Sequence, residues 1–132
     1  MNHNIKGRIY AKPAHQGALD TFTSKSVSTK DINSLGFLVS VASTATLLDA
    51  STKIVFSFEE SEDDTTYVAA PAESAYPDQA ELNAAAQIGK TTVIEYRGQA
   101  AFVKLVGTKT GAPAGDFSVV ALSLHPETMP AV

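Results

Sequence analysis

The chain has 132 residues, of which 44% are hydrophobic and 18% are charged, and its formal net charge is −4. This composition argues against wholesale disorder and indicates one globular domain with a single core. The absence of cysteine excludes disulfides, thiolate metal sites and cysteine nucleophiles. No apolar run approaches the roughly 18 residues that span a bilayer, and the N-terminal sequence lacks the apolar region of a secretory signal.

Charge is unevenly distributed along the sequence. Residues 1–53 carry six basic and three acidic groups, a balance of +3, and residues 54–132 carry four basic and eleven acidic groups, a balance of −7. The two balances sum to −4. Such a split is compatible with a contact between unlike surfaces of two molecules, and more simply with a solvated face of one molecule.

The first segment, residues 1–12, is basic and contains few apolar groups. Its sequence is compatible with an edge strand or an extended arm, which Pro13 and Gly17 are expected to end. We therefore expect an N-terminal arm or edge strand over residues 1–12 and a single β-sandwich domain over residues 13–132.

The next segment, residues 18–34, is rich in serine, threonine, lysine and aspartate. This composition predicts short strands connected by loops. The apolar residues expected to anchor the segment are Leu19, Phe22, Val27 and Ile32.

The middle of the chain contains the clearest strand patterns. Every second residue is a large apolar one in 37–41 and in 54–58, which is the period-two pattern of half-buried strands. The acidic run 60–64 is too polar for a core, and residues 65–68 return to β-favouring types. Residues 54–70 therefore predict a β-hairpin with a solvated acidic tip.

Residues 71–87 are harder to interpret. Pro71 and Pro77 interrupt the segment, and helix-forming residues fill 78–86, but Leu82 is the only large apolar residue among them. We expect a long loop that contains a short helical turn within 78–86.

The remaining sequence predicts strands at 91–96, 101–106 and 117–124, with a glycine-rich loop over 107–115. Both alternating sets of residues in the last strand are apolar, so this strand is expected to be covered on both faces. Seven to nine short strands at this spacing predict an all-β fold, an antiparallel β-sandwich of jelly-roll or immunoglobulin-like type. The residues expected to form its core are Phe37, Val39, Val41, Phe56, Phe58, Val103, Leu105, Val120 and Leu122.

No motif in the sequence carries recognisable chemistry. The acidic run 59–64 lacks the glycine and the spacing of a calcium loop, and His3, His15 and His125 are widely separated. There is no Gly-x-Ser-x-Gly elbow, and the 107–115 loop lacks the Gly-Lys-Ser/Thr ending of a phosphate-binding loop. We predict no enzymatic activity, no cofactor and no metal site; the negative charge also argues against nucleic-acid binding.

Four segments resemble small virion proteins of tailed bacteriophages, of the kind encoded beside the major capsid protein. Asp31–Val41 is the first, and Val55–Tyr67 is similar to the family's V-x-F-x-x-x-E-S-D-D-G-T-x-[FY] pattern. Glu95–Leu105 is similar to Y-x-G-x-x-R-Y-V-R-V, and Val119–Pro126 to a closing strand that ends in G-H-P. Together they span roughly residues 31–126.

The resemblance implies a capsid decoration (cement) or accessory head protein that binds the outer capsid surface and stabilises the head. Its partners would be the major capsid protein and further copies of itself, with no nucleic acid, membrane or cofactor. It would be made in the host cytoplasm and reside on the virion. From the basic arm and the apolar residues near it, the expected contacts with the capsid or a neighbouring subunit are Lys6, Arg8, Ile9, Tyr10, Lys12 and Phe22.

The alternative hypothesis is a carbohydrate- or cell-surface-binding β-sandwich of a phage tail or fibre. Sugar sites commonly use exposed aromatic platforms, and the chain has no tryptophan. The residues left for this role are Tyr10, Tyr67, Tyr76 and Tyr96.

Overall fold

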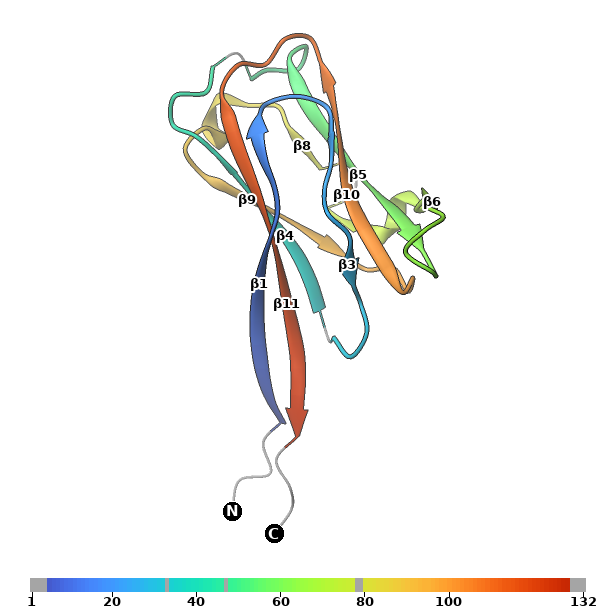
Figure 1. Ribbon diagram of the computed structural model, residues 1–132. Helices are drawn as coiled ribbons and strands as arrows, with labels where there is room; N and C mark the ends of the chain where they lie inside the picture. The colour runs from blue at the N-terminus through green and yellow to red at the C-terminus, as the bar shows by residue number, and fades with distance from the viewer. Residues whose placement is uncertain (1–4, 33, 47, 78–79, 129–132) are drawn as a thin grey trace.

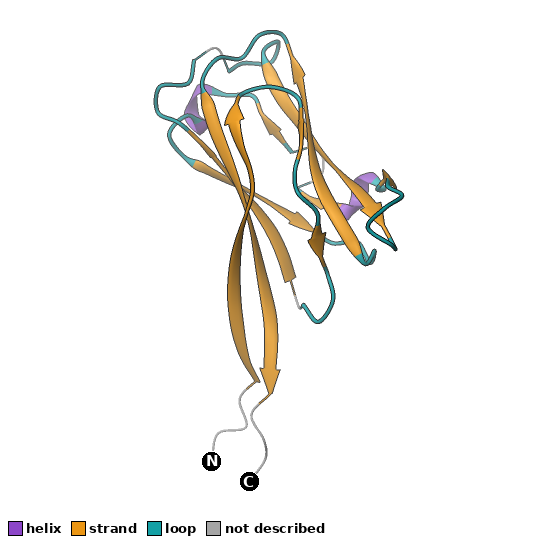
Figure 2. Ribbon diagram, in the orientation of Figure 1, coloured by secondary structure: helices purple, strands orange, loops and turns teal. Residues whose placement is uncertain are grey.

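The computed structural model describes residues 5–32, 34–46, 48–77 and 80–128, with the side chains of residues 5–8 and 125–128 outside the description. The described residues form two antiparallel sheets that pack face to face (Figure 1). Strands make up most of the molecule, and its helical turns are short (Figure 2). The predicted all-β sandwich is therefore confirmed.

The first sheet has five strands, and we call it the five-stranded sheet. All of its strand pairs are antiparallel. In spatial order, its strands are β1 (Ile5–Ala18), β11 (Asp116–Thr128), β4 (Ser34–Val41), β9 (Thr91–Tyr96) and β7 (Ala75–Tyr76).

The second sheet is built around the long pair β10 (Phe102–Thr110) and β5 (Lys53–Ser61). Short strands of two residues complete it on both sides. These are β2 (Phe22–Thr23) and β3 (Val27–Ser28), which pair with β10, and β6 (Val68–Ala69) and β8 (Glu81–Leu82), which pair with β5.

The core lies between the sheets and contains seven of the nine residues predicted for it. The other two, Val120 and Leu122, are only half-buried, because β11 directs Phe117, Val119 and Ala121 into the core instead. Alternation alone does not distinguish the two faces of this strand, since both are apolar. The prediction that Val120 and Leu122 belong to the core was therefore wrong.

The register between β11 and β4 decides which face of β11 is buried. Ala121 pairs with Phe37 and Val119 pairs with Val39, so these four residues lie on the same side of the sheet. Both β4 residues are fully buried. The opposite side of β11 is not covered by a strand of the second sheet, so the expectation that β11 is covered on both faces was also wrong.

Strand β1 is longer than predicted and passes the expected break at Pro13. It pairs with β11 from Ile5 to Ala18 and has a register shift between Pro13 and His15. Proline is confined to edge strands and bulges, and Pro13 occupies both. The predicted boundary between residues 12 and 13 therefore falls inside a continuous edge strand.

The two long predicted loops, 71–87 and 107–115, contain more regular structure than expected. β10 continues to Thr110, so Gly107 lies within a strand rather than in the predicted loop. A Cβ at Gly107 would lie 2.3 Å from the Phe22 ring, so this glycine serves close packing in the core. Within the 71–87 segment, the 3-10 turn η2 (Ala85–Gln87) overlaps the end of the range 78–86 predicted for a helical turn and extends one residue beyond it.

The 71–87 segment also contains the 3-10 turn η1 (Ala72–Ser74) and the short strands β7 and β8. Residues 78–79 lie outside the described residues. The predicted hairpin with an acidic tip is confirmed. Strands β5 and β6 flank the tip and pair with each other, with Glu60 opposite Val68.

Pairing between β1 and β11 continues beyond the body of the sandwich. β4 pairs with β11 only as far as Leu124, whereas β1 pairs with β11 to Thr128. Residues 5–8 and 125–128 therefore form a projecting two-stranded ribbon, and the described chain begins and ends at its tip (Figure 1).

Candidate binding surface

The base of the ribbon exposes the most accessible large apolar side chain of the described residues. Ile9 is 67% exposed and the adjacent Tyr10 is 48% exposed. Ile9 pairs with Leu124, at the level where β4 ends. An isolated two-stranded ribbon is only marginally stable in water, so a projecting ribbon with apolar side chains at its base is a candidate binding element.

The two sides of β1 near the ribbon differ in chemistry. Successive residues of a strand point to opposite faces, and Ile9 and Ala11 lie on the face directed away from the second sheet. Tyr10 and Lys12 lie on the other face, where Lys12 Nζ donates a hydrogen bond of 3.3 Å to the carbonyl oxygen of Ser26. One side is therefore apolar, and the other is aromatic and basic.

The six contact residues that the sequence predicted do not all lie in the same part of the structure. Ile9, Tyr10 and Lys12 lie together on the exposed part of β1. Lys6 and Arg8 belong to the same strand and occupy the same alternate positions of the sequence as Lys12, but their side chains lie outside the described residues. The sixth residue, Phe22, lies elsewhere.

Phe22 belongs to the core, so its predicted role as a contact residue was wrong. Its side chain is 7% exposed, and its ring centroid lies 4.4 Å from that of His15 and 5.1 Å from that of Phe117. Burial also lowers the pKa of His15. Phe22 is confirmed as one of the apolar anchors of residues 18–34, which leaves no exposed ring for a partner.

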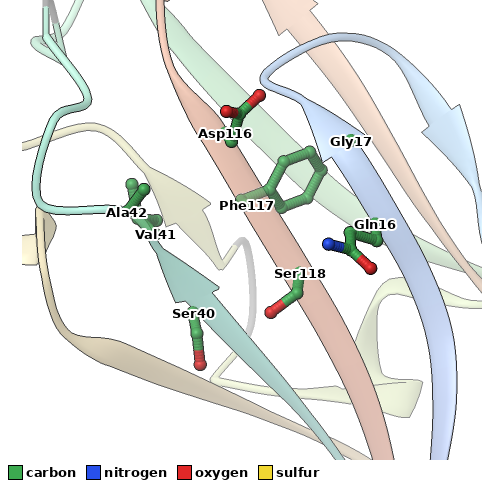
Figure 3. Close-up of a pocket in the computed structure, with 8 residues that line it drawn as sticks. All are labelled: Gln16, Gly17, Ser40, Val41, Ala42, Asp116, Phe117 and Ser118. Carbon is green, nitrogen blue, oxygen red and sulfur yellow. The ribbon is translucent and has the colours of Figure 1, made fainter.

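A depression of about 480 Å³ lies at the end of the β1–β11 pair away from the ribbon, and Figure 3 shows the residues that line it. It is lined by the ends of β1, β4 and β11, including Gln16, Ser40 and Ser118. Asp116 is the one ionisable residue in its lining. A carboxylate without a base, nucleophile or second acid beside it has no partner for acid–base or covalent catalysis, so this depression is not a candidate active site.

The acidic hairpin tip uses its carboxylates to hold a turn. Asp63 accepts hydrogen bonds of 2.9 Å from the backbone N–H groups of Thr65 and Thr66 and from Ser61 Oγ. The bonds from Thr66 and then Thr65 hold the pKa of the Asp63 carboxyl below its usual value. Among the described residues, no group of three His, Asp or Glu side chains is arranged to hold a metal ion.

The four tyrosines considered as sugar platforms have different environments. Tyr96 is buried, and its hydroxyl donates to Glu60 and accepts from the Ala100 N–H at 3.1 Å. Tyr67 is half-buried beneath Lys104, whose Nζ lies 4.1 Å from the ring centroid. Two rings remain as exposed platforms, Tyr10 and Tyr76.

The exposed Tyr76 lies on β7, the edge strand opposite β1 in the five-stranded sheet. Its side chain is 54% exposed, and the Arg97 guanidinium carbon lies 3.9 Å from its ring centroid. Arg97 also pairs with Glu95 at 3.2 Å. Tyr10 and Tyr76 therefore lie on opposite edges of one sheet, which makes them matched probes of two separate surfaces.

Comparison of the chain with protein-family models, curated proteins and solved structures found no match. None of the helices in the described part of the chain is long and apolar enough to cross a membrane. The interpretation of the surface therefore depends on its own geometry and chemistry.

Proposed function

We propose that this protein is a structural protein of a tailed-phage virion that binds the outer capsid surface through the ribbon of β1 and β11. The projecting ribbon with exposed Ile9 and Tyr10 at its base carries this proposal. The resemblance of residues 31–126 to small virion proteins supplies the identity of the partner. The all-β sandwich is an observed property of the structure, whereas the capsid role is our inference.

The chemistry of the ribbon suits attachment to a larger protein surface. Exposed apolar and aromatic side chains lose water-accessible area on binding, which stabilises the complex. The basic residues at alternate positions of β1 favour an acidic partner, and this attraction is screened by salt. A protein that binds only the assembled shell stabilises that shell by mass action.

Attachment to undecorated heads, assembled from the major capsid protein encoded with this chain, tests the proposal. We expect saturable binding of the purified protein, a gain in the heat resistance of the heads, and weaker binding at high salt. The absence of both saturable binding and a gain in heat resistance would contradict the capsid role.

Two tyrosine variants locate the contact. Tyr10→Ser removes the aromatic group beside the ribbon and is expected to weaken attachment by ~10-fold or more, as for an interface aromatic residue. Tyr76→Ser is the matched control, because Tyr76 is similarly exposed on the opposite edge of the same sheet. If both variants attach equally well, the ribbon is not part of the interface.

The exposure of Tyr76 favours a second candidate function, carbohydrate binding on a phage tail or fibre. The contact with Arg97 holds its ring in place, and a fixed, exposed aromatic ring is a suitable sugar platform. Binding to a glycan array that is lost with Tyr76→Ser and retained with Tyr10→Ser would support this function over capsid attachment.

A further inference from the structure

The outer face of the five-stranded sheet is apolar across four strands. One row, defined by strand pairing, runs from Pro13 through Val120 and Leu38 to Val93. Further apolar residues flank this row on β1 and β11. We call the whole set the outer face: Ile9, Ala11, Pro13, Leu38, Val93, Val120, Leu122 and Leu124.

This face is accessible in the single chain. Ile9 and Val93 are 67% and 54% exposed, while Leu38, Val120 and Leu122 are half-buried by their neighbours on the sheet. An antiparallel sheet with one solvated face normally alternates apolar and polar residues along its strands. β11 instead has apolar residues at successive positions. Packing in the core explains its inward-facing residues, so the apolar character of its outward-facing residues needs another explanation.

We propose that the outer face binds the same face of a second copy of this chain and forms a two-fold symmetric dimer. A two-fold interface brings one patch against itself, so the patch must be complementary to itself. Two apolar sheet faces can meet this condition, because twisted sheets pack at about 10 Å separation with their strands about 30° apart.

The charge distribution favours a second copy over a charged partner. The apolar set itself has no charged member. On the same side of the sheet β9 carries Glu95, which pairs with Gly36 and whose charge is balanced by Arg97 at 3.2 Å. The chain as a whole carries a net charge of −4, so two copies meet with least repulsion where charge is absent. Because Glu95 and Arg97 balance each other, this side of the sheet has no net charge that would select a partner of opposite sign.

The area of the face corresponds to a small, weak interface. Four strands at ~4.8 Å spacing and about seven residues at ~3.4 Å give a projected area of roughly 450 Å² for this part of the sheet, with its apolar and polar positions together. A standard interface buries ~800 Å² of accessible surface per partner. Accessible surface exceeds projected area because side chains rise from the sheet, and the base of the ribbon continues the face at Ile9.

The proposed dimer shares Ile9 with the capsid contact proposed above and otherwise uses the other side of β1. The outer face uses Ile9 and Ala11, whereas Tyr10 and Lys12 lie on the opposite side of β1. One side of the strand is therefore available to a second copy while the other faces a different partner. Loss of capsid binding with an intact dimer, or the reverse, separates the two proposals experimentally.

Sedimentation equilibrium of the full chain tests the dimer. We expect a reversible monomer–dimer equilibrium between about 1 μM and about 1 mM, the range of a small interface. Val93→Lys places a charge on the outer face at a site that is already half-exposed, and it is expected to raise the Kd by ~10-fold or more because the charge loses water in the dimer. Val120→Lys, near the centre of the face, is expected to give monomers.

Val68→Lys is the matched control, because Val68 is 61% exposed but lies on β6 of the second sheet. It is expected to leave the Kd unchanged. Circular dichroism and thermal denaturation verify that each variant is folded, and Val93→Lys keeps the test valid if Val120→Lys does not fold. A wild-type chain that stays monomeric to about 1 mM, or a dimer whose Kd is the same in the Val93→Lys and Val68→Lys variants, would overturn the proposal.

Discussion

The two faces of β11 have similar composition and different environments. Val119 is fully buried against the second sheet, whereas the adjacent Val120 points to the outer face and is half-buried. Apolar residues on the inner face stabilise the fold of one chain. Apolar residues on the outer face are less buried in one chain, so part of their contribution is expected in the proposed complex. The comparison teaches that an apolar strand face does not by itself say whether it is buried within one molecule, as the inner face is, or between two molecules, as we propose for the outer face.

The largest expected effect comes from removing a large inner side chain. Phe56 is 4% exposed and lies on β5 within the core. Phe56→Ala is expected to lower the free energy of unfolding by about 3–5 kcal/mol through lost burial and a residual cavity. Reversible denaturation measures this change, and a loss below about 1 kcal/mol would place Phe56 outside the core.

Overfilling the inner face is expected to have a somewhat smaller effect. A Cβ at Gly107 would lie 2.3 Å from one Phe22 ring carbon and 3.0 Å from a methyl carbon of Ile54. Gly107→Val is therefore expected to cost about 1–3 kcal/mol, because the Phe22 ring must move from its packed position. Gly36→Val is the matched control in another strand, since the nearest atom to a Cβ at Gly36 lies 3.7 Å away. Equal losses in the two variants would contradict close packing at Gly107.

The hydroxyl group of Tyr96, at the margin of the inner face, makes stability depend on pH and so provides a test. Burial, followed by the hydrogen bond to Glu60, raises the pKa of Tyr96 in the folded chain. The unfolded chain ionises first, near the usual tyrosine pKa of about 10, so the stability contributed by the neutral hydroxyl is fully present below that pH and is lost as pH rises through the folded pKa.

Tyr96→Phe is expected to reduce this alkaline loss and to cost about 1–3 kcal/mol near neutral pH, because Glu60 and the Ala100 N–H lose a partner. Denaturation of both proteins between pH 7 and about pH 11 makes the measurement. An alkaline loss of the same size in the variant would contradict a stabilising role for the neutral Tyr96 hydroxyl.

The smallest effect is expected on the outer face. Leu122→Ala removes a half-buried side chain that packs against no second sheet, so the monomer should lose less than about 1 kcal/mol. Leu105→Ala is the inner counterpart, fully buried on β10, with an expected loss of about 2–5 kcal/mol. Denaturation at low protein concentration compares them, and similar losses would show that the outer face is covered within one chain.

The strands with clear alternation were predictable from the sequence. The segments 37–41, 54–58 and 91–96 lie within β4, β5 and β9, and β4 and β5 extend a few residues beyond the predicted ends. The two-residue strands were harder to predict individually, because a period-two pattern needs more residues than they contain. The length of β1 was underestimated because a proline usually interrupts a strand. Pro13 is tolerated here because it lies on an edge strand and at a bulge.

The candidate surface was predicted only in part. Ile9 and Tyr10 were predicted as contact residues from a basic, weakly apolar N-terminal segment; both are exposed, and the contact itself stays a prediction. Phe22 was predicted both as an apolar anchor and as a contact residue. Its packing against His15 and Phe117 shows that it belongs to the core. The outer face was indicated by the two apolar sets of β11, but the choice between them depends on the register with β4, which is a tertiary property.

Isotope-filtered nuclear Overhauser measurements on a mixture of labelled and unlabelled chains test the central claim most directly. The claim is that one face of the five-stranded sheet is a core and the other is an interface between molecules. The account predicts intermolecular contacts between methyl groups of Val93, Val120 and Leu122 across the two copies. Absence of intermolecular contacts at concentrations where the chain self-associates, or contacts confined to Val68 and the second sheet, would contradict it.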